Sequence, residues 1–114
     1  MLRELLQSKI HKATITEADI AYIGSITIDQ DLLDRIDLWP GQKVTVVSNT
    51  SGHRLETYVI AGARGTGCIC MNGAAAHLIK KGDEVIIFSY AYSDRLIVPK
   101  CILVDAQNKY IQDL

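Results

Sequence analysis

The chain has 114 residues, 48% hydrophobic and 22% charged, which is enough for one domain with a single hydrophobic core. Twelve basic and thirteen acidic side chains give a net charge of -1, which argues against nucleic acid or an anionic membrane as partner. No apolar run approaches the roughly 20 residues of a membrane span, and Glu4 interrupts the N-terminal segment too early for a signal peptide. Three cysteines, an odd number, indicate a reducing, cytoplasmic environment.

Short extended segments dominate the predicted secondary structure. Alternating or β-branched residues predict strands at 13–16, 23–28, 43–47, 55–60, 84–90 and 101–104. Turn residues separate them at 40–41, 51–52, 81–83 and 107–108. Helical spacing or strong helix formers predict two short helices, at 31–36 and 74–79. These elements together predict one mainly β domain over residues 1–114, a compact barrel with short helices.

A weak internal repeat relates residues 34–47 to residues 75–88. Each copy contains the end of a predicted helix, a glycine turn at Gly41 or Gly82, and a following strand. Two related halves that close one barrel would produce this pattern. Independent convergence on the same turn-and-strand chemistry would produce it as well.

The Gly24-Ser25 step lies inside an apolar run, residues 22–29, that predicts a buried strand. Glycine permits backbone angles that other residues resist, and serine places a hydroxyl beside the preceding carbonyl. Such a step within a strand also marks an ordinary bulge or turn. The step alone therefore leaves a structural and a chemical interpretation open.

Spacing disfavours three other kinds of site. The glycine-rich segment 62–67 lacks the dinucleotide pattern and the Gly-Lys-Ser/Thr ending of phosphate-binding loops, so we expect a flexible hairpin loop. No metal site is expected, because the cysteines and histidines lack ligand spacing, and buried thiols are the alternative. The absence of a G-x-S-x-G elbow argues against a serine-histidine-acid triad. The residues that a metal would have to use are Cys68, Cys70, His53, His77 and Cys101.

Polar residues in apolar surroundings form the remaining candidate site. Lys9 precedes the first predicted strand, and strand alternation places Arg54 and Tyr58 on one face with Thr57 on the other. Residues 72–75 form a turn into a helix, whose first amides can bind an oxyanion. Ordinary roles also fit: solvated cations, a tyrosine packed on the barrel and an asparagine N-cap.

Four blocks of sequence occur in order: 6–12 with Ser8-Lys9-Ile10-His11, 22–31 with Gly24-Ser25, 54–60 with Thr57-Tyr58, and 71–76 with Met-Asn-Gly-Ala-Ala-Ala. Together they closely resemble the pyruvoyl-dependent aspartate 1-decarboxylases, and the resemblance extends from Met1 to about Val104. Ile26 replaces the cysteine of some relatives, at a position next to the reacting residue.

The resemblance implies a six-stranded double-psi β-barrel and a homotetramer with active sites between neighbouring subunits. It also implies that the chain cuts itself between Gly24 and Ser25, into fragments 1–24 (β chain) and 25–114 (α chain). Ser25 would become a pyruvoyl group, with Thr57 holding the oxyanion during the cut. No metal is implied, and the need for a maturation helper protein is left open.

The implied activity is that of a carboxy-lyase that converts L-aspartate to β-alanine and CO2 through a Schiff base, for pantothenate and coenzyme A synthesis. The resemblance makes Ser25 and Tyr58 catalytic, with Tyr58 protonating the product carbon. Substrate binding would fall to Lys9, Arg54, Thr57, Asn72, Gly73, Ala74 and Ala75. Two alternatives stay open: a non-catalytic double-psi barrel that binds a partner, and a pyruvoyl decarboxylase of another amino acid.

Overall fold

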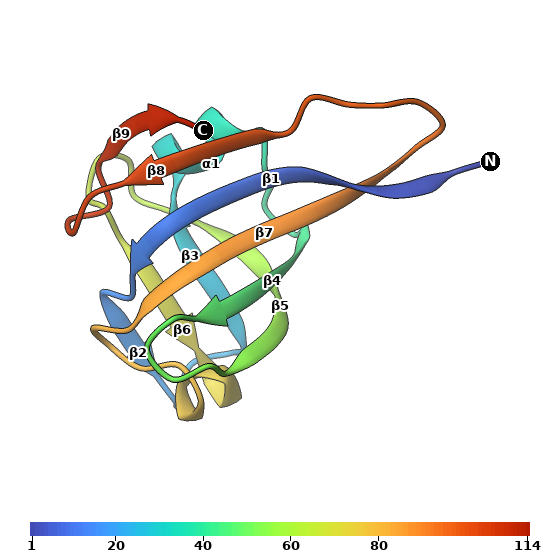
Figure 1. Ribbon diagram of the computed structural model, residues 1–114. Coiled ribbons are helices and arrows are strands. Elements are labelled where there is room, and N and C mark those ends of the chain that lie inside the picture. Colours follow the sequence, from blue (N-terminus) through green and yellow to red (C-terminus); the bar gives the residue numbers. More distant parts are fainter.

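Nine strands and two short helices make up the computed structural model, which describes residues 1–114 (Figure 1). The strands are β1 (Arg3–Thr14), β2 (Glu17–Asp19), β3 (Ser25–Asp29), β4 (Lys43–Ser48), β5 (Arg54–Gly62), β6 (Ile69–Asn72), β7 (Glu84–Ser93), β8 (Lys100–Val104) and β9 (Tyr110–Asp113). The helices are α1 (Gln30–Ile36) and the 3-10 helix η1 (Gly73–His77). Neither helix has the length and apolar character needed to cross a membrane.

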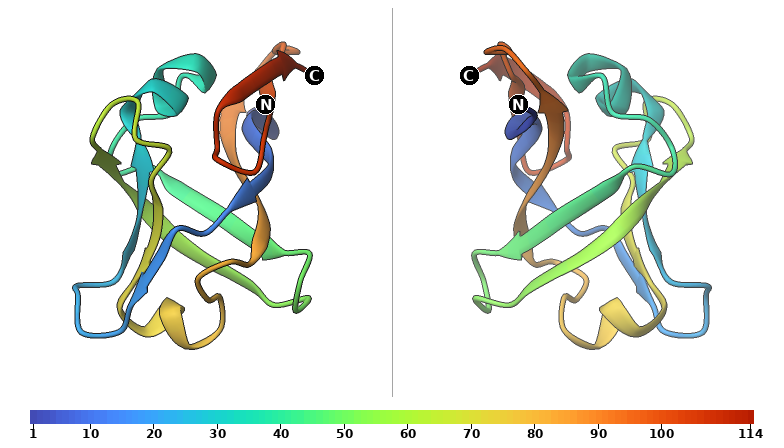
Figure 2. Two further views of the ribbon diagram at one scale, coloured as in Figure 1. Left: turned by 90° about the vertical axis from the view of Figure 1, so that its left-hand side faces the viewer. Right: turned by 90° about the vertical axis from the view of Figure 1, so that its right-hand side faces the viewer.

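The strands form one sheet in the order β2-β6-β3-β5-β4-β7-β1-β8-β9. The pairs β1–β8, β2–β6 and β3–β5 are parallel, and the other pairs are antiparallel. β2 continues β1 after Ile15 and Thr16, so neighbouring parts of the chain occupy distant places in the strand order. The sheet curls around its core as a result (Figure 2). The mainly β class is confirmed, and the closed six-stranded double-psi form stays a prediction.

The sequence repeat is also a repeat of structure. Gly41 and Gly82 have φ angles of 89° and 90°. The N–H of Gly41 donates to the Val59 carbonyl at 2.8 Å, and the N–H of Gly82 donates to the Ile15 carbonyl at 2.8 Å. In both cases the residue after the glycine accepts a hydrogen bond in return. The strands that follow the two turns, β4 and β7, pair with each other. This common unit supports two related halves.

Helix α1 confirms the prediction for residues 31–36. The Asp29 carboxylate caps its first turn by accepting from the Asp31 N–H at 2.8 Å, and Asp37 ends it in a left-handed conformation. The helix buries three side chains, Leu32, Leu33 and Ile36, in a core of 20 apolar residues. Burial of this face is what stabilises so short a helix.

The predicted strand at 23–28 is wrong at its beginning. β3 starts at Ser25, and the side chain of Ile23 is 76% exposed. The apolar residues before Gly24 therefore belong to an exposed loop, and Gly24-Ser25 marks the boundary of a strand rather than its interior. The first strand is much longer than the predicted segment 13–16, because its N-terminal part pairs with β7 in an arm that extends from the body (Figure 1).

Other elements also differ from the prediction. The short strands β2, β6 and β9 are outside the predicted strands. The segment 62–67 does not join a hairpin, since β3 lies between β5 and β6 in the sheet. The second helix is a five-residue 3-10 turn rather than a helix over 74–79. It begins at Gly73 with a φ of 70°, so the local backbone overrides the helix propensity of the alanines.

Candidate functional site

Ser25 is fixed at the first position of β3, beside the last residue of β6. Its registered partner is Asn72, and the Asn72 Nδ2 donates to the Ser25 Oγ at 2.9 Å. The same nitrogen donates to the Thr27 Oγ1 at 3.0 Å. The Ser25 side chain is fully buried, and its hydroxyl donates to the Ile23 carbonyl at a long 3.4 Å. Asn72 occupies the N-cap position of η1 without a capping bond, so its amide serves Ser25 and Thr27 instead.

The backbone of Gly73 packs directly on the backbone of Gly24. A Cβ atom on Gly73 would lie 2.7 Å from the Gly24 Cα and 3.0 Å from the Tyr22 carbonyl oxygen. A Cβ on Gly24 itself would meet only the Asn72 carbonyl oxygen, at 4.0 Å. Gly24 therefore has open space where a side chain would stand, while Gly73 has no room for one. Beyond Gly73, Ala74 is exposed and Ala75 is half-buried.

Strand β5 places Tyr58 beside Ser25. The parallel register between β3 and β5 begins at the pair Ile26–Val59, and Ser25 and Tyr58 each directly precede it. Because Ile26 and Val59 are buried in the core, the side chains of Ser25 and Tyr58 lie on the opposite, outward face. Tyr58 is 42% exposed on that face.

Thr57 lies on the other face of β5, as the alternation predicts. It shares this face with Leu55 and Val59, which pack in or against the core. Thr57 is half-buried, and its hydroxyl makes no side-chain hydrogen bond within the chain. Thr57 and Gly24 each lie two residues before the first registered pair of β5 and β3, so both precede the same end of the paired region.

Lys9 and Arg54 share a cavity of about 340 Å³ on another part of the surface. Lys9 is half-buried in β1, between Phe88 of β7 and Cys101 of β8. The guanidinium carbon of Arg54 lies 5.7 Å from the centroid of the Phe88 ring. The four ion pairs of the chain involve neither cation. Two uncompensated positive charges in one cavity of this size fit a small dicarboxylate.

The cavity also affects a neighbouring thiol. Burial raises the pKa of Cys101, and the positive charge of Lys9 acts in the opposite direction. All three cysteines are free, and burial likewise raises the pKa of Cys70. Their half-buried positions differ from the buried thiols considered from the sequence. The structure contains no cluster of three or more His, Cys, Asp or Glu side chains that would hold a metal.

One chain does not bring the two parts of the candidate site together. Arg54 and Tyr58 are four residues apart on the same face of β5, about 13 Å at roughly 3.3 Å per residue. Tyr58 lies beside Ser25, whereas Arg54 lies with Lys9. An amino acid is too small to contact Ser25 and the cavity of the same chain at once.

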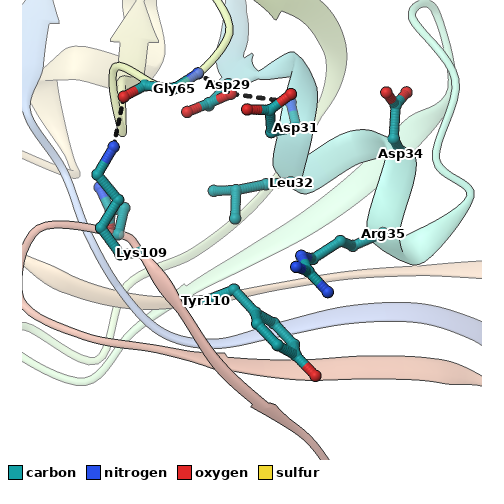
Figure 3. A pocket seen from close by; sticks show the side chains of 9 residues that line it. Asp29, Asp31, Leu32, Asp34, Arg35, Gly65, Lys109 and Tyr110 are labelled. Carbon is teal, nitrogen blue, oxygen red and sulfur yellow. Dashed lines mark hydrogen bonds between the residues drawn. The ribbon is translucent and has the colours of Figure 1, made fainter.

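The largest cavity, of about 370 Å³, lies elsewhere, between α1 and β9 (Figure 3). Its polar groups already have partners within the chain: Lys109 donates to the Gly65 carbonyl, and Arg35 lies over the Tyr110 ring. The amides of Gly65 and Gly67 donate to the Asp29 carboxylate at 3.1 and 2.8 Å. The glycine-rich segment therefore uses these amides to bind a carboxylate of its own chain.

Sequence reasoning missed Phe88 as part of the candidate site. It is the only phenylalanine of the chain, and it occurs with Tyr90 in the predicted strand 84–90. This pair of aromatic residues two positions apart on one strand face is the available signal. The position of Phe88 under Arg54 depends on the pairing of β7 with β4 and of β4 with β5, which no local pattern reveals.

Known proteins match the chain over nearly its whole length. The sequence model of the aspartate decarboxylase family matches residues 1–111. The aspartate 1-decarboxylase of Neisseria meningitidis is 52% identical over 100% of this chain and 92% of its own length. The aspartate 1-decarboxylase of Pelotomaculum thermopropionicum is 51% identical over 98% of this chain and 88% of its own length. That of Acetivibrio thermocellus is 52% identical over 97% of this chain and 91% of its own length. The chain therefore belongs to the aspartate decarboxylase family of enzymes.

Proposed function

We propose that this protein decarboxylates L-aspartate to β-alanine and CO2, after cutting its own chain between Gly24 and Ser25. The observation that carries the proposal is the buried Ser25 hydroxyl, held by Asn72 beside a Gly24 whose face is open. A solvated serine in a turn would need neither full burial nor a dedicated amide donor. Membership of the aspartate decarboxylase family supplies the substrate.

The cut begins with the Ser25 Oγ attacking the carbonyl carbon of Gly24. The hydroxyl proton leaves, the C–N bond breaks, and the amide becomes an ester with a free Ser25 amine. Elimination then releases Gly24 as a carboxylate and leaves a dehydroalanine, which takes up water and loses ammonia to give a pyruvoyl group. Asn72 fixes the direction of the attacking oxygen during the first step. Thr57, which like Gly24 lies two residues before the first pair of β3 and β5, would donate to the developing oxyanion.

The surroundings of Ser25 fit the group made from it. The hydrogen-bonding side chains at this position, Asn72 and Thr27, are neutral, and they stay beside residue 25 when its Oγ leaves with the Gly24 carboxylate. The pyruvoyl ketone supplies an electron sink for the pair left behind when CO2 departs. Tyr58, on the same face as Ser25, would deliver the proton to the resulting carbon.

Lys9 and Arg54 would bind the substrate by its charge. Aspartate carries two carboxylates, and these two cations have no acidic partner in the chain. An arginine binds a carboxylate through two parallel N–H donors, and a lysine adds a compact positive charge. The backbone of residues 73–75 would line the opposite side, where small side chains allow close approach.

A second copy of the chain would complete the site, as in the predicted homotetramer. Ser25 and the cavity of Lys9 and Arg54 lie too far apart in one chain, so the cavity of a neighbour must meet Ser25. The loop before Ser25 supports this arrangement, because Ile20, Tyr22 and Ile23 are apolar and more than half exposed. Such a patch is typical of a surface that another subunit covers.

The β-alanine product would serve pantothenate and coenzyme A synthesis. The three free cysteines support the predicted cytoplasmic location, where thiols stay reduced. No nucleic acid and no membrane partner is proposed.

The experiment that tests the activity is CO2 release from purified protein with aspartate or glutamate as substrate. We expect release from aspartate and far less from glutamate, and no release from the Ser25→Ala variant. Equal or faster release from glutamate would overturn the substrate. If neither aspartate nor glutamate releases CO2, and the chain stays uncut both after purification and in cell extract, the result would favour the non-catalytic binding module.

A further inference from the structure

We propose that Phe88 is a positioning residue for Arg54: its ring holds the guanidinium at the cavity without neutralising its charge. This inference rests on the proposed function, because it concerns the group that would bind a carboxylate of aspartate. Arg54 is the first residue of β5 and is exposed. It has no acidic partner and makes no side-chain hydrogen bond, so the Phe88 ring, 5.7 Å away, is the contact that restrains its guanidinium.

Phe88 is itself well fixed. It lies within β7, paired with Lys9 on one side and Thr45 on the other. Its ring packs edge-to-face against Tyr90, with centroids 5.8 Å apart and planes at 89°. A half-buried ring in the middle of a strand is a far more rigid element than an arginine at the end of one.

An aromatic ring suits this role better than an acidic side chain would. The face of the ring carries negative partial charge and attracts a guanidinium, which keeps its full positive charge and all its N–H donors. A carboxylate would orient Arg54 equally well, but it would occupy those donors and cancel the charge. Lys9 is the paired neighbour of Phe88, and the ring lines the cavity together with both cations.

The test compares three substitutions of Phe88 in the cleaved, purified enzyme. Phe88→Leu keeps the apolar volume and removes the ring, Phe88→Tyr keeps the ring, and Phe88→Met is a second ring-free variant should the leucine chain fail to fold. We expect the ring-free variants to raise KM for aspartate by about two- to fivefold, with kcat little changed, and Phe88→Tyr to restore the KM of the parent. Succinate, a dicarboxylate without an amine, should lose affinity by the same factor in calorimetry.

The decisive comparison repeats Phe88→Leu in an Arg54→Ala background. If the ring acts through Arg54, its removal there leaves the succinate affinity unchanged, a binding readout that does not depend on the residual activity of the Arg54→Ala background. An equal loss in both backgrounds, or no loss in the parent, overturns the positioning role. If Arg54→Ala alone leaves KM unchanged, the assignment of Arg54 in the proposed function fails first, and the positioning role fails with it. Intact mass of each variant confirms that the chain is cut as in the parent.

Discussion

The backbones of Gly73 and Gly24 are in contact: a Cβ added to Gly73 would lie 2.7 Å from the Gly24 Cα. Residues 49 positions apart thus place the first residue of η1 against the bond that we propose is cut. The contact explains why glycine is needed at position 73 on two grounds, its positive φ of 70° and the lack of space.

Replacing Gly73 by alanine should therefore impair cleavage as well as stability. The added methyl must displace Gly24, so we expect at least a tenfold slower cut, together with a loss of about 1–3 kcal/mol in the free energy of unfolding. Gly82→Ala is the matched control, because Gly82 has a φ of 90° but nothing within 4 Å of its added Cβ. The control should lose about 1 kcal/mol in stability and keep the parent cleavage rate. Equal cleavage rates in both variants would contradict the role given to the Gly73–Gly24 contact.

Removal of the Asn72 amide should slow the cut by releasing the Ser25 hydroxyl. In Asn72→Ala the Ser25 Oγ keeps only its 3.4 Å contact with the Ile23 carbonyl, so we expect cleavage to slow by about ten- to a hundredfold. Thr27→Val removes the other acceptor of the same amide and should have a smaller effect. Fragment formation followed on denaturing gels measures both rates. An Asn72→Ala chain that is cut as fast as the parent would show that the hydrogen bond is not needed.

Mixed assemblies should reveal whether two subunits build each site. Co-expression of Ser25→Ala and Arg54→Ala chains gives assemblies in which some Ser25 residues face an intact Arg54 of a neighbour. With random mixing, about a quarter of the sites would be complete, so we expect about a quarter of the parent activity. Each variant alone should be nearly inactive. Mixed assemblies no more active than the separate variants would place the whole site within one chain.

The Cys101 thiol should report the charge of Lys9. Because burial raises the pKa of Cys101, the thiol stays protonated at neutral pH. Alkylation should therefore accelerate only at a pH above the usual pKa of a cysteine thiol. Lys9 lowers this pKa, so Lys9→Met should shift the alkylation profile to higher pH and slow labelling by about twofold at a fixed, mildly alkaline pH. Mass spectrometry of the Cys101 peptide distinguishes it from the other two cysteines. A profile that moves to lower pH, or does not move, would show that Lys9 does not act on this thiol.

Local patterns were sufficient for much of the fold. Alternation over 43–47 and 84–90 predicted β4 and β7, and helical spacing predicted α1, because each of these segments buries one face against the same core. β6 escaped prediction since it has only four residues and lies between glycines. Apolar content placed Gly24-Ser25 inside a strand, although the exposed apolar residues before it form a loop surface.

The candidate site was predicted residue by residue but not as an arrangement. Alternation correctly separated Thr57 from Arg54 and Tyr58 on β5. The contacts of Asn72 with Ser25 and of Phe88 with Arg54 depend on pairing between distant strands, and the register of such pairs is not written in either strand alone. Backbone contacts such as that of Gly73 with Gly24 are equally invisible in a one-dimensional pattern.

The measurement that tests the central claim most directly is the intact mass of the purified protein. The account predicts two fragments, residues 1–24 and 25–114. The larger fragment should be lighter, by the mass of ammonia, than the same fragment with an intact N-terminal serine. Borohydride should reduce the ketone of its pyruvoyl group. The Ser25→Ala variant should give one uncut chain. A larger fragment with an unmodified N-terminal serine, or a parent protein that stays whole while releasing CO2 from aspartate, would contradict the claim that Ser25 is the source of the catalytic group.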